Sequence, residues 1–268
     1  MLITPPKIMT MLLVARDTDI LAIALGVVDK IPNLYIKRQT PSGVGFVSVY
    51  EIAKNIGNEQ SRAIPGYHSF TGCDSVSSFA GKGKKIGLKL MLADERIQKC
   101  FSQLGDEWEL PEDVFQELAR FTCLLYSSKT HCTSPNNLRY EIFRLKKGVV
   151  QSGQLPPCED VLRLQAMRAN YQAAIWRRCL EPYPIVPSPD ERGWKITANS
   201  IEIQWMSGPP APEAILEFLS CKCKRACKAP RCQCVNNNLR CTAACNLQNC
   251  NNAPAIQSLD DTDSDSDE

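Results

Sequence analysis

Eight cysteines lie within thirty positions near the carboxyl end of the chain, in the order Cys221-x-Cys223-x3-Cys227-x4-Cys232-x-Cys234-x6-Cys241-x3-Cys245-x4-Cys250. The surrounding segment has few large apolar side chains, so it cannot build a conventional hydrophobic core. Tetrahedral zinc held by thiolates replaces such a core in many small domains. Cys-x-Cys pairs suit clusters in which one thiolate bridges two metals, and we therefore expect a shared multi-zinc cluster. Two independent four-ligand zinc sites, a disulfide-stapled tail and a merely cysteine-rich tail are the alternatives.

The amino-terminal residues bear on which of these alternatives applies. Residues 1–14 lack the basic region, apolar run and small-residue cleavage site of a secretory signal, and no stretch reaches membrane-spanning length. We therefore expect a reducing compartment, the nucleus or alternatively the cytoplasm, and no membrane partner. Thiolates are then available for metal rather than for disulfides.

The cysteine segment also carries a local positive charge. The whole chain has a formal net charge of only +2, but the cluster contains no acidic residue. Its basic side chains are Lys222, Lys224, Arg225, Lys228, Arg231 and Arg240. This pattern predicts salt-dependent binding to DNA, and a solvated surface that keeps a small domain soluble is the alternative. The acidic tail, residues 259–268, could compete with DNA for the basic patch, more strongly after phosphorylation of Ser264 or Ser266.

The cysteine order resembles the tesmin-type CXC domain over residues 221–252. The resemblance rests on Cys221-Lys-Cys223-Lys, on Arg231-Cys232-Gln-Cys234 and on Cys250-Asn251-Asn252. It implies zinc binding and DNA binding, with Arg231 in the position from which the family enters the minor groove. The family has a further cysteine where this chain has Leu247, which leaves full metal occupancy open. Family members often hold two such repeats, and this chain holds one.

A second group of candidate chemical residues lies near the amino end. Asp17 and Asp19 follow an apolar run, and Gly72-Cys73-Asp74 precedes the turn Gly81-Lys82-Gly83-Lys84-Lys85. Clustered carboxylates at strand ends are ligands for Mg²⁺ or Mn²⁺, and a glycine-lysine turn presents N–H groups and ammonium charge to a phosphate. Helix caps or turn residues are the alternative for the carboxylates.

These elements together resemble the later half of the flap-endonuclease-like PIN nucleases over residues 11–92. The resemblance implies that Asp17, Asp19 and Asp74 are catalytic metal ligands and that Gly81, Gly83 and Lys84 contact a phosphate backbone. Such nucleases have an additional acidic strand and further carboxylates before the Asp-x-Asp element, whereas this chain starts almost at that element. We therefore expect slow or absent hydrolysis from an incomplete, truncated or decayed copy of the domain.

The elements that position these residues follow from the apolar pattern. A buried strand is predicted at residues 11–15 and further strands at 34–37 and 46–50, with helices at 20–28 and 51–56, which indicates an α/β layer. Helices are predicted at 84–92, 94–104, 111–126 and 159–179. A proline-rich stretch with one short strand at 201–205 follows, and then a short helix at 212–219. The fold class is thus α/β, a partial PIN-like sheet with a following helical region and a small zinc-stabilised, secondary-structure-poor module.

This pattern predicts the domain boundaries. They are 1–92 for the partial PIN-like region, 93–180 for the helical region, 181–219 for the proline-rich tether, 220–253 for the CXC zinc module and 254–268 for an acidic disordered tail. In the helix at 159–179, Leu164, Met167, Tyr171 and Ala174 form the predicted core face. Arg163, Arg168, Arg177 and Arg178 are predicted to lie elsewhere on the surface.

The two histidines and the cysteines outside the cysteine-rich segment show no ligand or catalytic spacing. We expect His68 and His131 to be structural, with catalysis as the alternative, and we expect Cys100, Cys123, Cys132, Cys158 and Cys179 to be buried thiols. Leu138-Arg139-Tyr140, Arg168-Ala169-Asn170-Tyr171-Gln172-Ala173-Ala174 and Trp176-Arg177-Arg178, in this order before the CXC element, resemble uncharacterised animal proteins related to mobile elements. The sequence favours a nuclear, zinc-dependent DNA-binding protein with an inactive nuclease-like region. An active Mg²⁺- or Mn²⁺-dependent nuclease and a protein-interaction adaptor are the alternatives.

Overall fold

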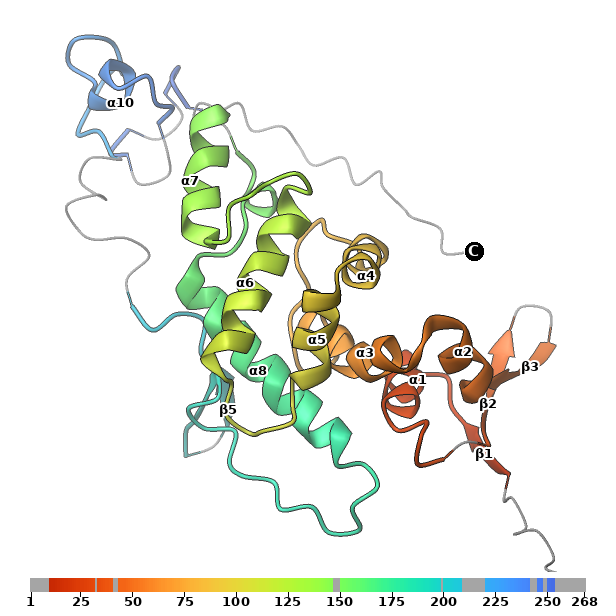
Figure 1. Ribbon diagram of the computed structural model, residues 1–268. Helices are drawn as coiled ribbons and strands as arrows, with labels where there is room; N and C mark the ends of the chain where they lie inside the picture. The colour runs from red at the N-terminus through yellow and green to blue at the C-terminus, as the bar shows by residue number, and fades with distance from the viewer. Residues whose placement is uncertain are drawn as a thin grey trace, which may run out of the picture. The chain divides into compact units, whose positions relative to one another are not determined.

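The computed structural model describes residues 10–31, 33–40, 43–146, 150–198, 200–208, 220–241, 245–247 and 250–253. The chain, drawn in Figure 1, divides into two compact units. The first unit is Met1–Arg139 together with Ser152–Gly208, and the second is Tyr140–Gln151 together with Pro209–Glu268. Small sheets and helices build the first unit as a mixed α/β fold, and the second contains the cysteine-rich region. The predicted helix at 212–219 and the acidic tail lie outside the described residues.

The first unit begins with a three-stranded sheet in the order β1-β2-β3. Strand β1 (Met11–Val14) runs parallel to β2 (Leu34–Thr40), and β3 (Gly43–Ser48) returns antiparallel to β2. Helix α1 (Thr18–Gly26) makes the connection that a parallel pair requires. Leu34 and Ile36 of β2 are buried with Leu25 of α1, so one side of the sheet carries a small core.

The burial of β1 differs from the prediction. All four of its residues are exposed, and 77% of Val14 is accessible. Within the described residues β1 pairs only with β2, and no β1 residue belongs to the buried core beside the sheet. A parallel strand is buried only where layers cover both of its faces, and that condition is not met here. The strand itself is confirmed, and its burial was wrongly predicted.

Helices α2 (Val49–Ile56) and α3 (Asn58–Phe70) follow directly, separated only by Gly57. The positive φ of 98° at Gly57 ends α2, as predicted, but α3 was not predicted because Gly57 and Pro65 both read as helix breakers. Helix α3 instead packs tightly on its neighbours. A Cβ on Gly26 of α1 would lie 2.5 Å from Pro65, and one on Gly66 would lie 2.3 Å from the Phe101 carbonyl.

The main core of the first unit gathers around α3. It is formed with α4 (Lys84–Ala93), α5 (Glu95–Gln103), α6 (Glu112–Tyr126) and α8 (Glu159–Arg177). Phe70, Phe101 and Phe121 are fully buried at its centre, and the Phe101 and Phe121 rings meet edge to face at 5.0 Å. Figure 1 shows α8 running beside α6. Two further described helices lie along the chain between α6 and α8: α7 (Pro135–Leu145), which was not predicted, and the short η1 (Ser152–Gln154).

The arginines of α8 correct a second prediction. Arg168 is only 1% exposed, and its Nη1 donates to the carbonyl oxygens of Gly193 and Gln204, each at 3.0 Å. Arg177 donates to the carbonyls of Phe101, Ser102 and Leu104. The last carbonyls of a helix lack partners within it, so Arg177 serves as a cap for the end of α5. These two side chains are structural donors, not surface charge.

The part of the predicted tether that the structure describes also packs against α8. Strands β4 (Trp194–Ile196) and β5 (Ile201–Ile203) pair antiparallel, and the Trp194 and Tyr171 rings lie 5.5 Å apart. Cys100 and Cys123 are buried thiols as predicted, whereas Cys132 and Cys158 are half-buried and Cys179 is exposed. No described helix combines the length and the apolar character needed to cross a membrane.

Candidate metal centre and nucleic-acid interface

The cysteine segment of the second unit has little regular structure in its described part, where α10 (Gln233–Asn236) is the helix that forms. Its core consists of sulfur. Six cysteines are buried around a common centre, and Cys223, Cys250 and Leu247 are partly buried against them. Backbone hydrogen bonds close the segment, because Cys241 N–H donates to the Asn252 carbonyl and Asn246 N–H to the Cys221 carbonyl, each at 2.9 Å.

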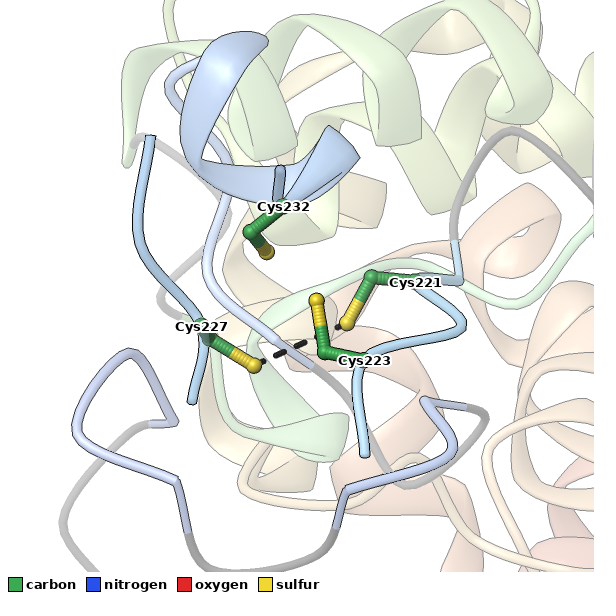
Figure 2. Close-up of side chains that lie close together, drawn as sticks. All are labelled: Cys221, Cys223, Cys227 and Cys232. Carbon is green, nitrogen blue, oxygen red and sulfur yellow. Dashed lines mark hydrogen bonds between the residues drawn. The ribbon is translucent and has the colours of Figure 1, made fainter. Parts of the chain in front are cut away.

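The eight cysteines form three groups of metal-ligand geometry, in each of which the sulfur atoms lie within 4.8 Å of one another. We name them sites 1, 2 and 3. Site 1 contains Cys221, Cys223, Cys227 and Cys232; site 2 contains Cys221, Cys234, Cys241 and Cys245; site 3 contains Cys227, Cys241 and Cys250. Figure 2 shows the side chains of site 1 converging from the N-cap of α10, Cys232, and from the preceding loop.

The spacing between the sulfur atoms identifies what the groups can hold. Cys221 Sγ lies 3.7 Å from Cys227 Sγ and 3.9 Å from Cys241 Sγ, and Cys234 Sγ lies 3.6 Å from Cys245 Sγ. A disulfide needs about 2.05 Å, so these are not disulfides. Two sulfurs at about 2.3 Å from one tetrahedral zinc lie about 3.8 Å apart. The cluster could therefore hold metal ions such as zinc, and the observed spacings match that geometry.

Three cysteines belong to two sites each. Cys221 joins sites 1 and 2, Cys227 joins sites 1 and 3, and Cys241 joins sites 2 and 3. A thiolate has more than one lone pair and can bridge two metals, so the three sites can close into one ring. This arrangement is what the expectation of a shared multi-zinc cluster describes, and it does not divide into two independent four-ligand sites.

The surroundings of the thiols shift their pKa values in different directions. Burial and neighbouring thiols raise the pKa of the Cys227 and Cys241 thiols. Burial also acts on Cys232, but the Val235 N–H, the Cys221 thiol, the Cys234 N–H and the Cys241 thiol together outweigh it and lower its pKa to about 7. Metal binding would therefore displace protons from Cys227 and Cys241 into solvent, and it meets less of this opposition at Cys232.

The six basic residues of the segment are all exposed. Five of them, Lys222, Lys224, Arg225, Lys228 and Arg231, line one concave surface together with Pro230 and Gln233. Arg240 does not line it. Cys223 is shared between this concave surface and site 1, so the loop that would hold the metal is also the loop that presents the positive charge.

The carboxylates predicted at the amino end also converge. The side chains of Asp17, Asp19 and Asp74 lie within 4.8 Å of one another, and this acidic triad could hold Mg²⁺. Asp17 is at the same time the N-cap of α1, because its Oδ1 accepts from the Asp19 N–H at 3.0 Å. A tight turn positions Asp74, since Cys73 and Val76 exchange backbone hydrogen bonds across it.

His68 and Lys84 stand beside the acidic triad. His68 Nε2 lies 2.6 Å from Asp19 Oδ1, and His68 Nδ1 lies 3.0 Å from the Lys84 ammonium. An ammonium only donates, so Nδ1 accepts and the ring proton sits on Nε2, facing the carboxylate. Burial lowers the pKa of Lys84, and the charge of Asp19 opposes that shift. His68 was expected to be structural, because a lone histidine carries no local pattern that reveals a contact with a residue 49 positions away.

The glycine-lysine turn leads into α4, whose N-cap is Gly83. Gly81 has a φ of 66°, and both glycines have open space where a Cβ would stand. The Lys84 ammonium donates to the Gly72 carbonyl as well as to His68, so it tethers the turn to the loop that carries Asp74. Phosphate contact by Gly81, Gly83 and Lys84 stays a prediction.

Comparison with protein-family models, with curated proteins and with solved structures finds no match to this chain. The CXC and PIN resemblances therefore rest on the residues themselves. The grouping of the cysteine sulfur atoms is the observation that supports metal binding most directly.

Proposed function

We propose that this chain is a zinc-dependent DNA-binding protein whose residues 220–253 form a CXC-type zinc-thiolate module. The observation that supports the proposal is the sulfur spacing of 3.6 to 3.9 Å among cysteines that form shared groups. Zinc would supply the core that this segment otherwise lacks, because its own apolar side chains are few. The cysteines would hold the metal, and no acidic side chain competes within the segment.

DNA enters the proposal through charge. Five basic side chains share one concave surface at the rim of the metal centre. A rigid cation-rich surface gains affinity for a phosphate backbone by releasing counterions, and an arginine favours a narrow, electronegative minor groove. Arg231 stands immediately before Cys232, so the metal centre would fix its backbone. We propose the nucleus as the site of action.

The experiment is a binding titration of the zinc-loaded full-length chain against labelled duplex DNA at several salt concentrations. We expect affinity to fall linearly on a logarithmic salt scale and to disappear in Cys232→Ser. Binding that is insensitive to salt, or that survives in Cys232→Ser, contradicts the proposal.

A second candidate function, metal-dependent phosphodiester hydrolysis, is favoured by the convergence of Asp17, Asp19 and Asp74. Carboxylates so arranged can bind Mg²⁺ or Mn²⁺ and activate water. With three carboxylates the second metal of a two-metal site would lack ligands, so we propose that this PIN-like region is inactive. Cleavage of branched or single-stranded DNA in Mn²⁺, abolished by Asp74→Asn, would establish the enzyme instead.

A further inference from the structure

Site 3 differs from the other two sites in its number of ligands. Sites 1 and 2 each bring four thiols together, and site 3 brings three, Cys227, Cys241 and Cys250. Residues 220–253 contain no histidine, aspartate or glutamate. The segment therefore offers site 3 no fourth thiolate, imidazole or carboxylate.

The Cys-x-Cys pairs show where a fourth ligand would have stood. In the first pair, Cys221 reaches sites 1 and 2 and Cys223 reaches site 1; in the second, Cys232 reaches site 1 and Cys234 reaches site 2. Both pairs thus spread over neighbouring sites. Cys245 belongs to site 2, and the residue two positions later is Leu247, which packs against the cluster. The pattern of the pairs indicates that a thiol at position 247 would reach a site adjacent to site 2, as site 3 is, and leucine cannot ligate metal.

We propose that site 3 is an open metal site whose fourth position is filled by an exchangeable oxygen donor, water. The inference rests on the proposed zinc cluster. Zinc bound by four thiolates is closed, whereas three protein ligands leave a position through which solvent, a chelator or a small thiol can enter. Cys250 is the least buried residue of the three, with an intermediate exposure.

Unequal lability follows from this arrangement. The ion in site 3 leaves first, while those in sites 1 and 2 stay. Cys227 and Cys241 remain bound to the neighbouring sites when site 3 empties, so the module loses one ion without losing its core. The site is then suited to exchange zinc with a thiol-rich acceptor, or to take a soft ion in its place.

The test uses the zinc-loaded full-length chain, freed of excess metal and challenged with a chromogenic chelator. We expect up to three zinc ions per chain, of which one is released at least about tenfold faster than the others. Leu247→Cys should abolish the fast phase by completing the site, and Leu247→Ala, the matched control, should keep it. A truncation after Ala253 removes the tail carboxylates and should leave the fast rate unchanged; a faster release there would assign the fourth oxygen to the tail and overturn water as its source.

Cadmium-113 NMR provides a readout that does not depend on rates. The cadmium-loaded chain should show two signals of four-sulfur type and one of three-sulfur, one-oxygen type, and Leu247→Cys should convert the third to four-sulfur type. A single release rate in the wild type that Leu247→Cys does not change overturns the open site. Two tightly bound ions with no third at any zinc concentration overturn it as well but leave the proposed function intact. A chain that binds no zinc contradicts both the open site and the proposed function.

Discussion

The sulfur atoms of Cys221 and Cys227 lie 3.7 Å apart, a distance that matches the edge of a zinc-thiolate tetrahedron, and each of these two cysteines belongs to two sites. Their removal therefore has a different consequence from removal of Cys223, which serves site 1 alone. In the proposed metal cluster, the position of a cysteine sets how many metal ions would depend on it.

The first prediction compares a shared cysteine with an unshared one. Cys221→Ser should lower bound zinc by more than one ion and unfold the segment, because two sites lose a ligand. Cys223→Ser, the matched control two positions away, should affect site 1 only. Elemental analysis of the purified variants measures the zinc content. Equal losses in the two variants would mean that the thiols are not shared.

The second prediction concerns the basic concave surface. Arg231→Ala should weaken DNA binding at low salt. It should also reduce the slope of log affinity against log salt by about 1, because the protein then makes one contact fewer with the DNA phosphates. Arg240→Ala removes the same charge outside that surface and should have a smaller effect. Fluorescence anisotropy with labelled duplex measures both. Equal effects would show that net charge, not the concave surface, governs binding.

The third prediction tests how α8 is anchored in the first unit. Asn170 is 1% exposed; its Oδ1 accepts from the Gly105 N–H at 2.8 Å, and its Nδ2 donates to the carbonyls of Glu107 and Trp108. Asn170→Leu leaves these three groups unpaired, and we expect a loss of about 2–4 kcal/mol in unfolding free energy. Gln116→Leu, an exposed control on α6, should change it by less than about 0.5 kcal/mol. Urea denaturation measures the unfolding free energy of both variants. An unchanged unfolding free energy in Asn170→Leu would show that Asn170 does not anchor α8.

The fourth prediction is a pH dependence. Burial raises the pKa of Tyr67 from 10.0 to about 12, and its hydroxyl donates to the Lys84 carbonyl. The unfolded chain therefore releases this proton first, so stability is fully present below pH 10 and is lost as pH rises toward 12, by about 2–3 kcal/mol. Tyr67→Phe should be less stable at neutral pH but lose less on alkalinisation. Urea unfolding from pH 8 to 11 gives the comparison, and parallel losses in the two proteins would assign the effect to another group.

Much of the secondary structure could be predicted from the apolar pattern. The helices at Lys84–Ala93, Glu112–Tyr126 and Glu159–Arg177 follow it closely, because long periodic segments leave little choice of element. Helix α3 could not be predicted, since Gly57 and Pro65 are local breakers that tertiary packing against α1 and α5 overrides. The burial of Arg168 and Arg177 also depends on distant carbonyls, which no periodicity reveals.

The candidate site divides in the same way. Cysteine spacing predicts a shared cluster, because ligand chemistry constrains the chain locally. The division of the eight thiols into three unequal groups depends instead on how residues 220–253 fold back on themselves. The proximity of Asp74 to Asp17 and Asp19 likewise depends on tertiary folding of the first unit. The contact of His68 with Asp19 joins residues far apart in the chain, and nothing in the flanking sequence indicates it.

The measurement that tests the central claim most directly is DNA binding by the full-length chain before and after its metal is removed. We predict that chelation abolishes binding to duplex DNA at low salt and that added zinc restores it to the original affinity. Undiminished binding by metal-free protein whose cysteine segment stays folded would contradict the account.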